Sequence, residues 1–149
     1  MPEAGEISLK LAEGLVGAEA LPEAAQRAAL RLVRDWWGVA LAGTVAPAAR
    51  LVREWIEGQG ESAQCRVFGG GRAAAAAAAL ANAAAAHVLE LDDLHAGATL
   101  HPGAPIIAAA LAVAEREHAS GTAFLRAVAL GYEAALRIGE AVNPSHYRY

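Results

Sequence analysis

Apolar and polar positions along the chain recur with the period of an α-helix. Leucines and a valine give residues 8–17 one apolar side, and Pro22 sets the start of a second helix. Polar residues then recur at spacings of three and four as far as Asp35, which leaves the other faces of this helix apolar. No face carries a charge from Trp36 onward, so this half of the helix is predicted to be buried on all sides and to end near Gly43.

Pro47 opens a third predicted helix, which lies on the surface. Its apolar residues are expected to face inward and its charged residues to face solvent. The inward set is Leu51, Val52, Trp55 and Ile56, and the outward set is Arg50, Arg53, Glu54 and Glu57. Glycines then bracket residues 62–68, for which we predict a short extended segment. The glycine run at 69–71 lacks the lysine and serine or threonine of a phosphate-binding loop, so we interpret it as a flexible connection.

The rest of the chain is predicted to be helical, which makes the fold class all-α. Residues 72–89 form an alanine helix, because alanine has the highest helix propensity and its small side chain lets neighbouring backbones approach. Asn82 is the polar residue in the interior of this helix, so it needs a buried partner or a functional role. A nearly uncharged helix follows at 106–118, and Ser120 caps a last helix that ends at Asn143. The alanine helix and the helix at 106–118 are expected to be the most buried.

Helices with so little polar surface must be covered on all sides, and a domain of this size cannot cover all of them by itself. We therefore expect association with a second subunit, as a homodimer, or with the remainder of a longer polypeptide. The tail after Asn143 reads as a segment interrupted in mid-course at Tyr149.

Composition narrows the possible functions of this single domain, residues 1–149. A net charge of −4 and a pI near 5.7, with no basic run, argue against nucleic acid as a partner. A single cysteine, Cys65, excludes an internal disulfide and is typical of a reducing compartment, so the expected location is cytoplasmic. The chain begins without a basic and then apolar leader, and its longest uncharged run is mostly alanine, so neither a signal peptide nor a membrane span is expected.

Ionisable residues concentrate between 87 and 101. Three of the five histidines, His87, His95 and His101, lie there among the carboxylates Glu90, Asp92 and Asp93. A histidine titrates near neutral pH and adjacent carboxylates adjust its pKa, so such a cluster suits proton transfer. We take His101 as the candidate base or acid. His118 and His146 are interpreted as surface residues.

Two other classes of function remain open at this stage. A metal-dependent hydrolase could use His87, Asp92 or Asp93, His95 and His101 as nitrogen and oxygen ligands, although their spacing matches no established metal signature. Alternatively, the chain could be a non-catalytic helical module retained for association. Metal analysis and activity measurements would separate these alternatives.

Several motifs give the chain a family resemblance. The string ALANAAAAHVLELDDLH, followed by His101-Pro102 and then AAALAVAE, resembles the N-terminal helical part of the MmgE/PrpD family. The strings GYEAALRIGEA at 131–141 and WGVALAG at 37–43 are similar to two further family stretches. This family includes 2-methylcitrate dehydratase, cis-aconitate decarboxylase and iminodisuccinate epimerase.

The resemblance implies an all-helical core domain that, in family members, a smaller lid domain completes. It further implies a dimer with a cofactor-free, metal-free acid/base site that dehydrates, decarboxylates or epimerises a small di- or tricarboxylic acid. Family members are longer and supply a further histidine and lysines that hold substrate carboxylates. The chain is therefore expected to be an N-terminal fragment without the lid, essentially inactive on such acids by itself.

Roles for individual residues follow from the same resemblance. His101 matches the family's active-site histidine before proline, and Asp92-Asp93 match its aspartate pair. Glu90 stands where aspartate is commoner, and Leu94 stands where threonine is usual, which removes a hydroxyl. The catalytic candidates are His101, Asp93 and Glu90, and the substrate-binding candidates are Asp92, His95, His87 and Asn82. For His87 and Asn82, a role as satisfied core polar groups remains equally open, and Asp92 could serve only as a hydrogen-bonding group at a helix terminus.

Overall fold

A computed structural model of the chain describes residues 4–18, 20–60 and 62–145. Within these residues the chain forms helices almost throughout, which confirms the all-α prediction. The helices are α1 (Ala4–Val16), α2 (Glu23–Gly43), α3 (Pro47–Glu57), α4 (Ala75–His87), α5 (Gly103–Arg116) and α6 (Gly121–Val142). The strands β1 (Cys65–Arg66) and β2 (Arg72–Ala73) form a small antiparallel hairpin. No helix in the described ranges is long and apolar enough to cross a membrane.

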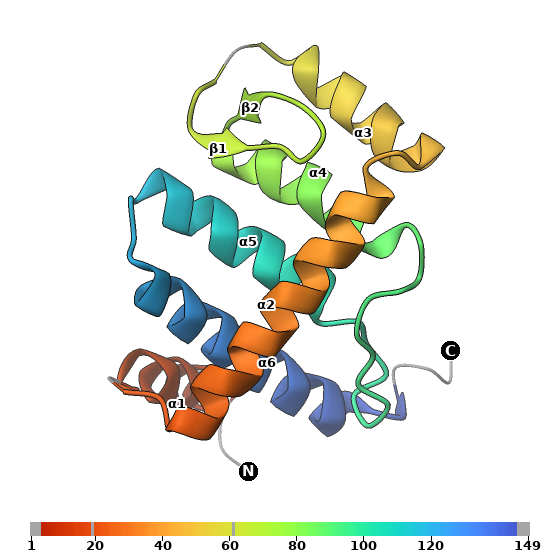
Figure 1. Cartoon of the computed structure of the whole chain (residues 1–149). Coiled ribbons are helices and arrows are strands. Elements are labelled where there is room, and N and C mark those ends of the chain that lie inside the picture. The colour runs from red at the N-terminus through yellow and green to blue at the C-terminus, as the bar shows by residue number, and fades with distance from the viewer. Residues whose placement is uncertain (1–3, 19, 61, 146–149) are drawn as a thin grey trace.

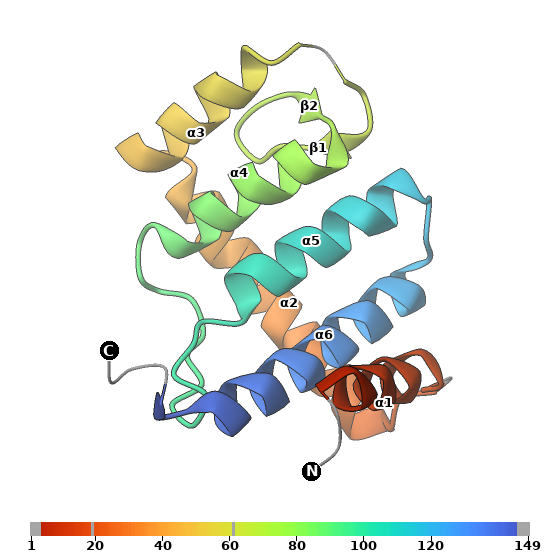
Figure 2. The same cartoon turned by 180° about the vertical axis from the view of Figure 1, so that it is seen from behind.

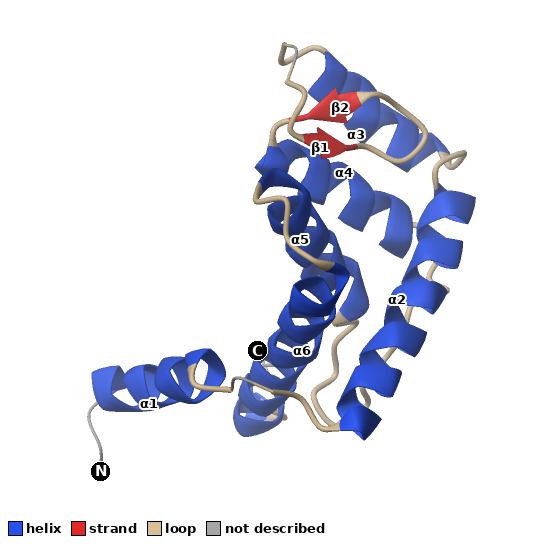
Figure 3. Ribbon diagram, turned by 60° about the vertical axis from the view of Figure 1, so that its left-hand side comes forward, coloured by secondary structure: helices blue, strands red, loops and turns tan. Residues whose placement is uncertain are grey.

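Helices α4, α5 and α6 lie in a row, and α2 crosses all three of them (Figure 1). The view from behind shows the row in front of α2 (Figure 2). Helix α3 packs against α4 at one end of the row, next to the hairpin. Helix α1 lies at the other end and extends away from the body (Figure 3), with few contacts to α6.

Small residues allow the central helices to pack closely. The main core contains Trp36 and Ala40 of α2, Ala86 of α4, Ile107 of α5 and Val128 of α6, together with further buried alanines. Helices α4 and α5 have the largest buried share of residues among the described helices, as predicted. The core is therefore centred where α2 crosses α4 and α5.

The hairpin is tied to α4 by Asn82, which is 2% exposed. Its Oδ1 accepts a hydrogen bond of 2.9 Å from the Phe68 amide, and its Nδ2 donates one of 2.9 Å to the Arg66 carbonyl. Both polar groups of this buried side chain are thus satisfied, as burial requires. The glycine run forms the connection between the strands, where Gly69 has φ 73°.

Two predictions about buried faces are wrong within this chain. Trp37 and Leu41 are 46% and 57% exposed, so the second half of α2 is not covered on all sides. Leu51 and Trp55 of α3 are 67% and 59% exposed rather than facing inward. The reason is geometric: α3 packs through Ala49 and Ile56, and at about 100° per residue Trp55, one position from Ile56, and Leu51, two positions from Ala49, point in other directions.

This exposed apolar surface predicts self-association. We expect the chain to dimerise, to aggregate or to bind a dye that reports apolar surface, and the double variant Trp37→Gln/Leu41→Gln to reduce that behaviour. Because both side chains are largely exposed, their replacement should change the free energy of unfolding by only about 0.5 kcal/mol or less. Sedimentation velocity measures the association. A compact monomer without dye binding would contradict the prediction.

Candidate functional site

The candidate site is the segment that joins α4 to α5. Helix α4 ends at His87 and α5 begins at Gly103. Between them the chain turns at Glu90, which has φ 52°, and closes on itself through an isolated bridge between His95 and Leu100. Asn143, just after α6, fixes this loop by donating from Nδ2 to the Gly97 carbonyl at 2.6 Å. The loop is thereby attached to the end of α6.

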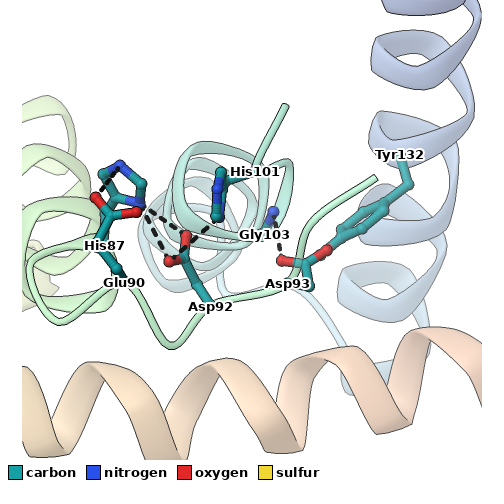
Figure 4. Close-up of polar contacts among 7 residues, drawn as sticks. All are labelled: His87, Glu90, Asp92, Asp93, His101, Gly103 and Tyr132. Atoms are coloured by element: carbon teal, nitrogen blue, oxygen red, sulfur yellow. Dashed lines mark hydrogen bonds and ion pairs between the residues drawn. The ribbon is translucent and has the colours of Figure 1, made fainter. Parts of the chain in front are cut away.

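Three of the predicted residues lie together: His87 and His101 flank the buried carboxylate of Asp92 (Figure 4). The Asp92 side chain is 1% exposed. His87 Nδ1 lies 2.9 Å from Asp92 Oδ2 and 3.1 Å from Oδ1. His101 Nδ1 lies 3.4 Å from Asp92 Oδ1 on the other side, and the two imidazole rings meet edge to face with centroids 5.1 Å apart.

Asp92 forms hydrogen bonds with His87 but not with His101. The hydrogen bond to the Asp92 carboxylate raises the pKa of His87 above its ordinary value, because it stabilises the imidazolium, while partial burial opposes this shift. The 3.4 Å approach of His101 Nδ1 to Asp92 lacks the alignment of a hydrogen bond, so this buried nitrogen has no hydrogen-bond partner in the described part of the chain. His101 therefore has an unused polar atom in the site.

Asp93 points away from the histidines toward α6 (Figure 4). Its Oδ1 accepts a 3.0 Å bond from the Gly103 amide at the start of α5, and its Oδ2 accepts a 3.0 Å bond from the Tyr132 hydroxyl. Partial burial, together with the neighbouring charge of Asp92, raises the pKa of Asp93, although the two hydrogen bonds oppose this shift. Asp93 thus fixes the beginning of α5 against α6, next to His101 in the chain.

We predict that Tyr132→Phe destabilises the fold, because it removes the hydroxyl that contacts Asp93 and keeps the buried ring. Tyr132 is 8% exposed, and its burial raises the pKa of its hydroxyl, so the group stays protonated as a donor. Loss of this bond to a carboxylate should cost about 1.5–3 kcal/mol of unfolding free energy. Urea denaturation measures the change. An unchanged midpoint would show that the Asp93 contact contributes nothing to stability.

The other predicted residues lie around this centre. Glu90, exposed, places Oε1 3.5 Å from His87 Nε2. His95 turns toward α6, where its Nε2 lies 3.8 Å from Glu140 Oε1 and its Nδ1 accepts from the Ala98 amide at 3.0 Å. The structure does not bring Asn82 into the cluster, because the hairpin occupies its amide.

Among the remaining histidines, His118 is exposed at the end of α5, as predicted. His146 lies outside the described residues.

A pocket of about 440 Å³ opens beside the histidines. Its lining is His87, His101, Leu80, Ala83, Ala84, Ala104 and Pro105. The wall is apolar except for the two imidazoles, and none of these lining residues is a lysine or arginine. Within the described residues, the pocket thus offers proton-transfer groups but no lysine or arginine for a carboxylate.

Two residues that position the site escaped the sequence reasoning, Tyr132 and Gly103. An added Cβ at Gly103 would lie 2.2 Å from Asp93 Oδ1 and 2.8 Å from the Tyr132 hydroxyl. The contact of Asp93 with Tyr132 and with the start of α5 therefore requires glycine at position 103. The GYEAALRIGEA string contains Tyr132, but nothing local indicates that its hydroxyl contacts a loop 39 residues earlier.

Comparison with known proteins gives one match. A family model described as the MmgE/PrpD N-terminal domain matches residues 14–149, which confirms the resemblance seen in the motifs. The match starts within α1 and includes the whole His87–Gly103 segment. No curated protein and no solved structure matches the chain significantly.

Proposed function

Since the chain belongs to the MmgE/PrpD family, a family of lyase-like enzymes, we propose that it carries the acid/base groups of a cofactor-independent lyase or isomerase. The proposed substrate is a small di- or tricarboxylic acid, and the reaction is dehydration, decarboxylation or epimerisation. The observation that carries the proposal is the arrangement of His87 and His101 around buried Asp92 at the wall of a pocket. The proposed location is the cytoplasm, which the lone buried Cys65 supports.

All three reactions depend on proton transfer at a carbon next to a carboxylate. In dehydration, a base takes the proton from this carbon and an acid protonates the departing hydroxyl, which leaves as water. In decarboxylation, an acid delivers a proton to the carbon that loses CO₂. In epimerisation, the proton leaves from one face of the carbon and a proton returns to the other. Each therefore needs a proton-exchanging side chain within reach of the substrate carbon.

We assign this proton exchange to His101. It lines the pocket, and its side chain is 29% exposed although its Nδ1 is covered, so one edge of the ring reaches the cavity. Asp92, which lies between the two imidazoles, is assigned the role of holding His87 by a hydrogen bond and stabilising the protonated form of His87. His87, supported by Glu90, would act as the second acid or contact the substrate.

Asp93, a catalytic candidate from the sequence, is reassigned as a positioning residue. Both of its carboxylate oxygens already accept hydrogen bonds from Gly103 and Tyr132.

Substrate carboxylates require permanent positive charge, and no lysine or arginine among the described residues lines this pocket. The residues that line the pocket include two histidines and otherwise only apolar side chains. We therefore propose that cationic groups outside the described residues complete the site, from a continuing polypeptide or from a second subunit. This requirement agrees with the exposed apolar surface on α2 and α3, which such a partner would cover.

A non-catalytic association module remains the second candidate, favoured by that same exposed surface. The deciding experiment assays a full-length family protein that contains this domain on a panel of hydroxylated and unsaturated di- and tricarboxylic acids. A chelator is present throughout. We expect turnover of at least one acid, followed by the change in double-bond absorbance or by release of CO₂. A folded, dimeric protein inactive on the whole panel would favour the association module.

A further inference from the structure

Three side chains in the loop between α4 and α5 have the geometry of a metal-binding site. His87, Asp92 and His101 each offer a ligand atom, and these atoms all lie within 4.8 Å of one another. A tetrahedral zinc centre with ligand bonds of about 2.1 Å separates its ligand atoms by about 3.4 Å. From the single oxygen Asp92 Oδ1, His87 Nδ1 lies 3.1 Å away and His101 Nδ1 lies 3.4 Å away, which is close to this value.

The ligand nitrogens of the two imidazoles lie within 4.8 Å of each other. Both side chains are partly exposed, 47% for His87 and 29% for His101, and their ring centroids are 5.1 Å apart. Asp92 is the fixed member, because its side chain is 1% exposed and sits between the rings. An ion would therefore be held by one fixed carboxylate and two partly exposed rings.

Two further features favour an ion here over a purely structural cluster. His101 Nδ1 is buried and has no hydrogen-bond partner in the described residues. One potential ligand atom of the cluster is therefore unpaired. His87 carries Glu90 on its other ring nitrogen, with Oε1 at 3.5 Å from Nε2. A carboxylate on the second nitrogen of a histidine is the outer-shell arrangement that orients metal-ligating imidazoles.

A pocket adjoins the proposed ion site. His87 and His101 line this cavity of about 440 Å³, although Asp92 does not line it and His101 Nδ1 is covered. Three protein ligands and one open position characterise zinc sites that accept water or a small ligand. Two imidazoles with a single carboxylate suit zinc and related transition ions far better than magnesium or calcium, which prefer oxygen ligands.

We propose that His87, Asp92 and His101 form a binding site for one zinc ion. The ion occupies the imidazole that the proton-transfer function uses, so zinc and catalysis compete for His101. The zinc site stands on ligand geometry, however, and its test does not involve turnover. Failure of the one proposal therefore leaves the other intact.

The test is zinc binding to the purified 149-residue chain after removal of metal with a chelator. Competition with a chromophoric chelator gives the stoichiometry and affinity for Zn²⁺, and the visible absorption of Co²⁺ reports the ligand geometry. We expect one ion per chain and a tetrahedral Co²⁺ spectrum. His87→Ala, Asp92→Ala and His101→Ala should each weaken Zn²⁺ binding by more than about 100-fold, and Glu90→Gln should weaken it by about 10-fold, as loss of an outer-shell partner does.

His95→Ala and His118→Ala are the matched controls, because these histidines lie outside the cluster. Both should bind zinc as the parent chain does, and circular dichroism checks that every variant is folded. Equal zinc affinity in the parent and in the three ligand variants would overturn the proposal. Binding lost only with His95 or His118 would equally overturn it.

Discussion

Replacing His101 with alanine in a full-length family protein that contains this domain is expected to lower kcat by about two to four orders of magnitude. A positioned general acid or base contributes this much, and His101 combines a place on the pocket wall with a buried, unpartnered Nδ1 next to Asp92. The Michaelis constant should change far less, because cations elsewhere would hold the substrate carboxylates.

The control for this experiment is His118→Ala, an exposed histidine at the end of α5. It should retain parental turnover, and both variants should give the parental circular dichroism spectrum. The assays contain a chelator, so that zinc bound to the cluster does not contribute to the difference. Near-normal turnover in a folded His101→Ala protein would remove His101 from the mechanism.

The variant Gly43→Ala is expected to lose about 3 kcal/mol of unfolding free energy. An added Cβ at Gly43 would lie 1.9 Å from the Ala85 carbonyl oxygen and 2.9 Å from its carbonyl carbon. These atoms belong to the backbone of α4, so no side-chain rotation relieves the overlap, and α2 must move away from α4. Such a shift would open the core at the crossing where Ala40 and Ala86 are fully buried.

The matched control is Gly38→Ala on the same helix. An added Cβ at Gly38 meets nothing within 4 Å. Alanine inside a helix is favoured over glycine, so this variant should gain about 0.5–1 kcal/mol. Chemical denaturation of both variants measures the contrast. Equal stability of Gly43→Ala and Gly38→Ala would show that α2 and α4 are not in close contact at Gly43.

The helices were predictable because proline and glycine mark their ends. Pro47 begins α3, Gly43 ends α2, and Ser120 caps α6 by accepting from the Ala123 amide. Why position 43 requires glycine was not predictable. The cause is the close approach of the α4 backbone, not a left-handed conformation at the helix end. The direction of Leu51 and Trp55 was not predictable either, because helical spacing gives an apolar side without saying which neighbour covers it.

The sequence predicted which residues form the candidate site, but it did not predict which partners their side chains contact. The segment from His87 to His101 concentrates the ionisable residues, and the loop does bring His87, Asp92 and His101 together. The family resemblance gave Asp93 a catalytic role and Asp92 a substrate-binding one, whereas the structure places Asp92 between the two histidines and directs Asp93 toward α6. Neighbouring side chains in an irregular loop have no fixed relative direction, and the partner of Asp93, Tyr132, comes from a distant helix.

Deuterium incorporation tests most directly whether the His101 cluster transfers protons at a carbon next to a carboxylate. The full-length family protein and its His101→Ala variant are incubated with the turned-over acid in D₂O and a chelator, and NMR follows deuterium at that carbon. The account predicts incorporation by the parent protein and a loss of about two to four orders of magnitude in the variant. Equal incorporation rates in the two folded proteins would contradict it.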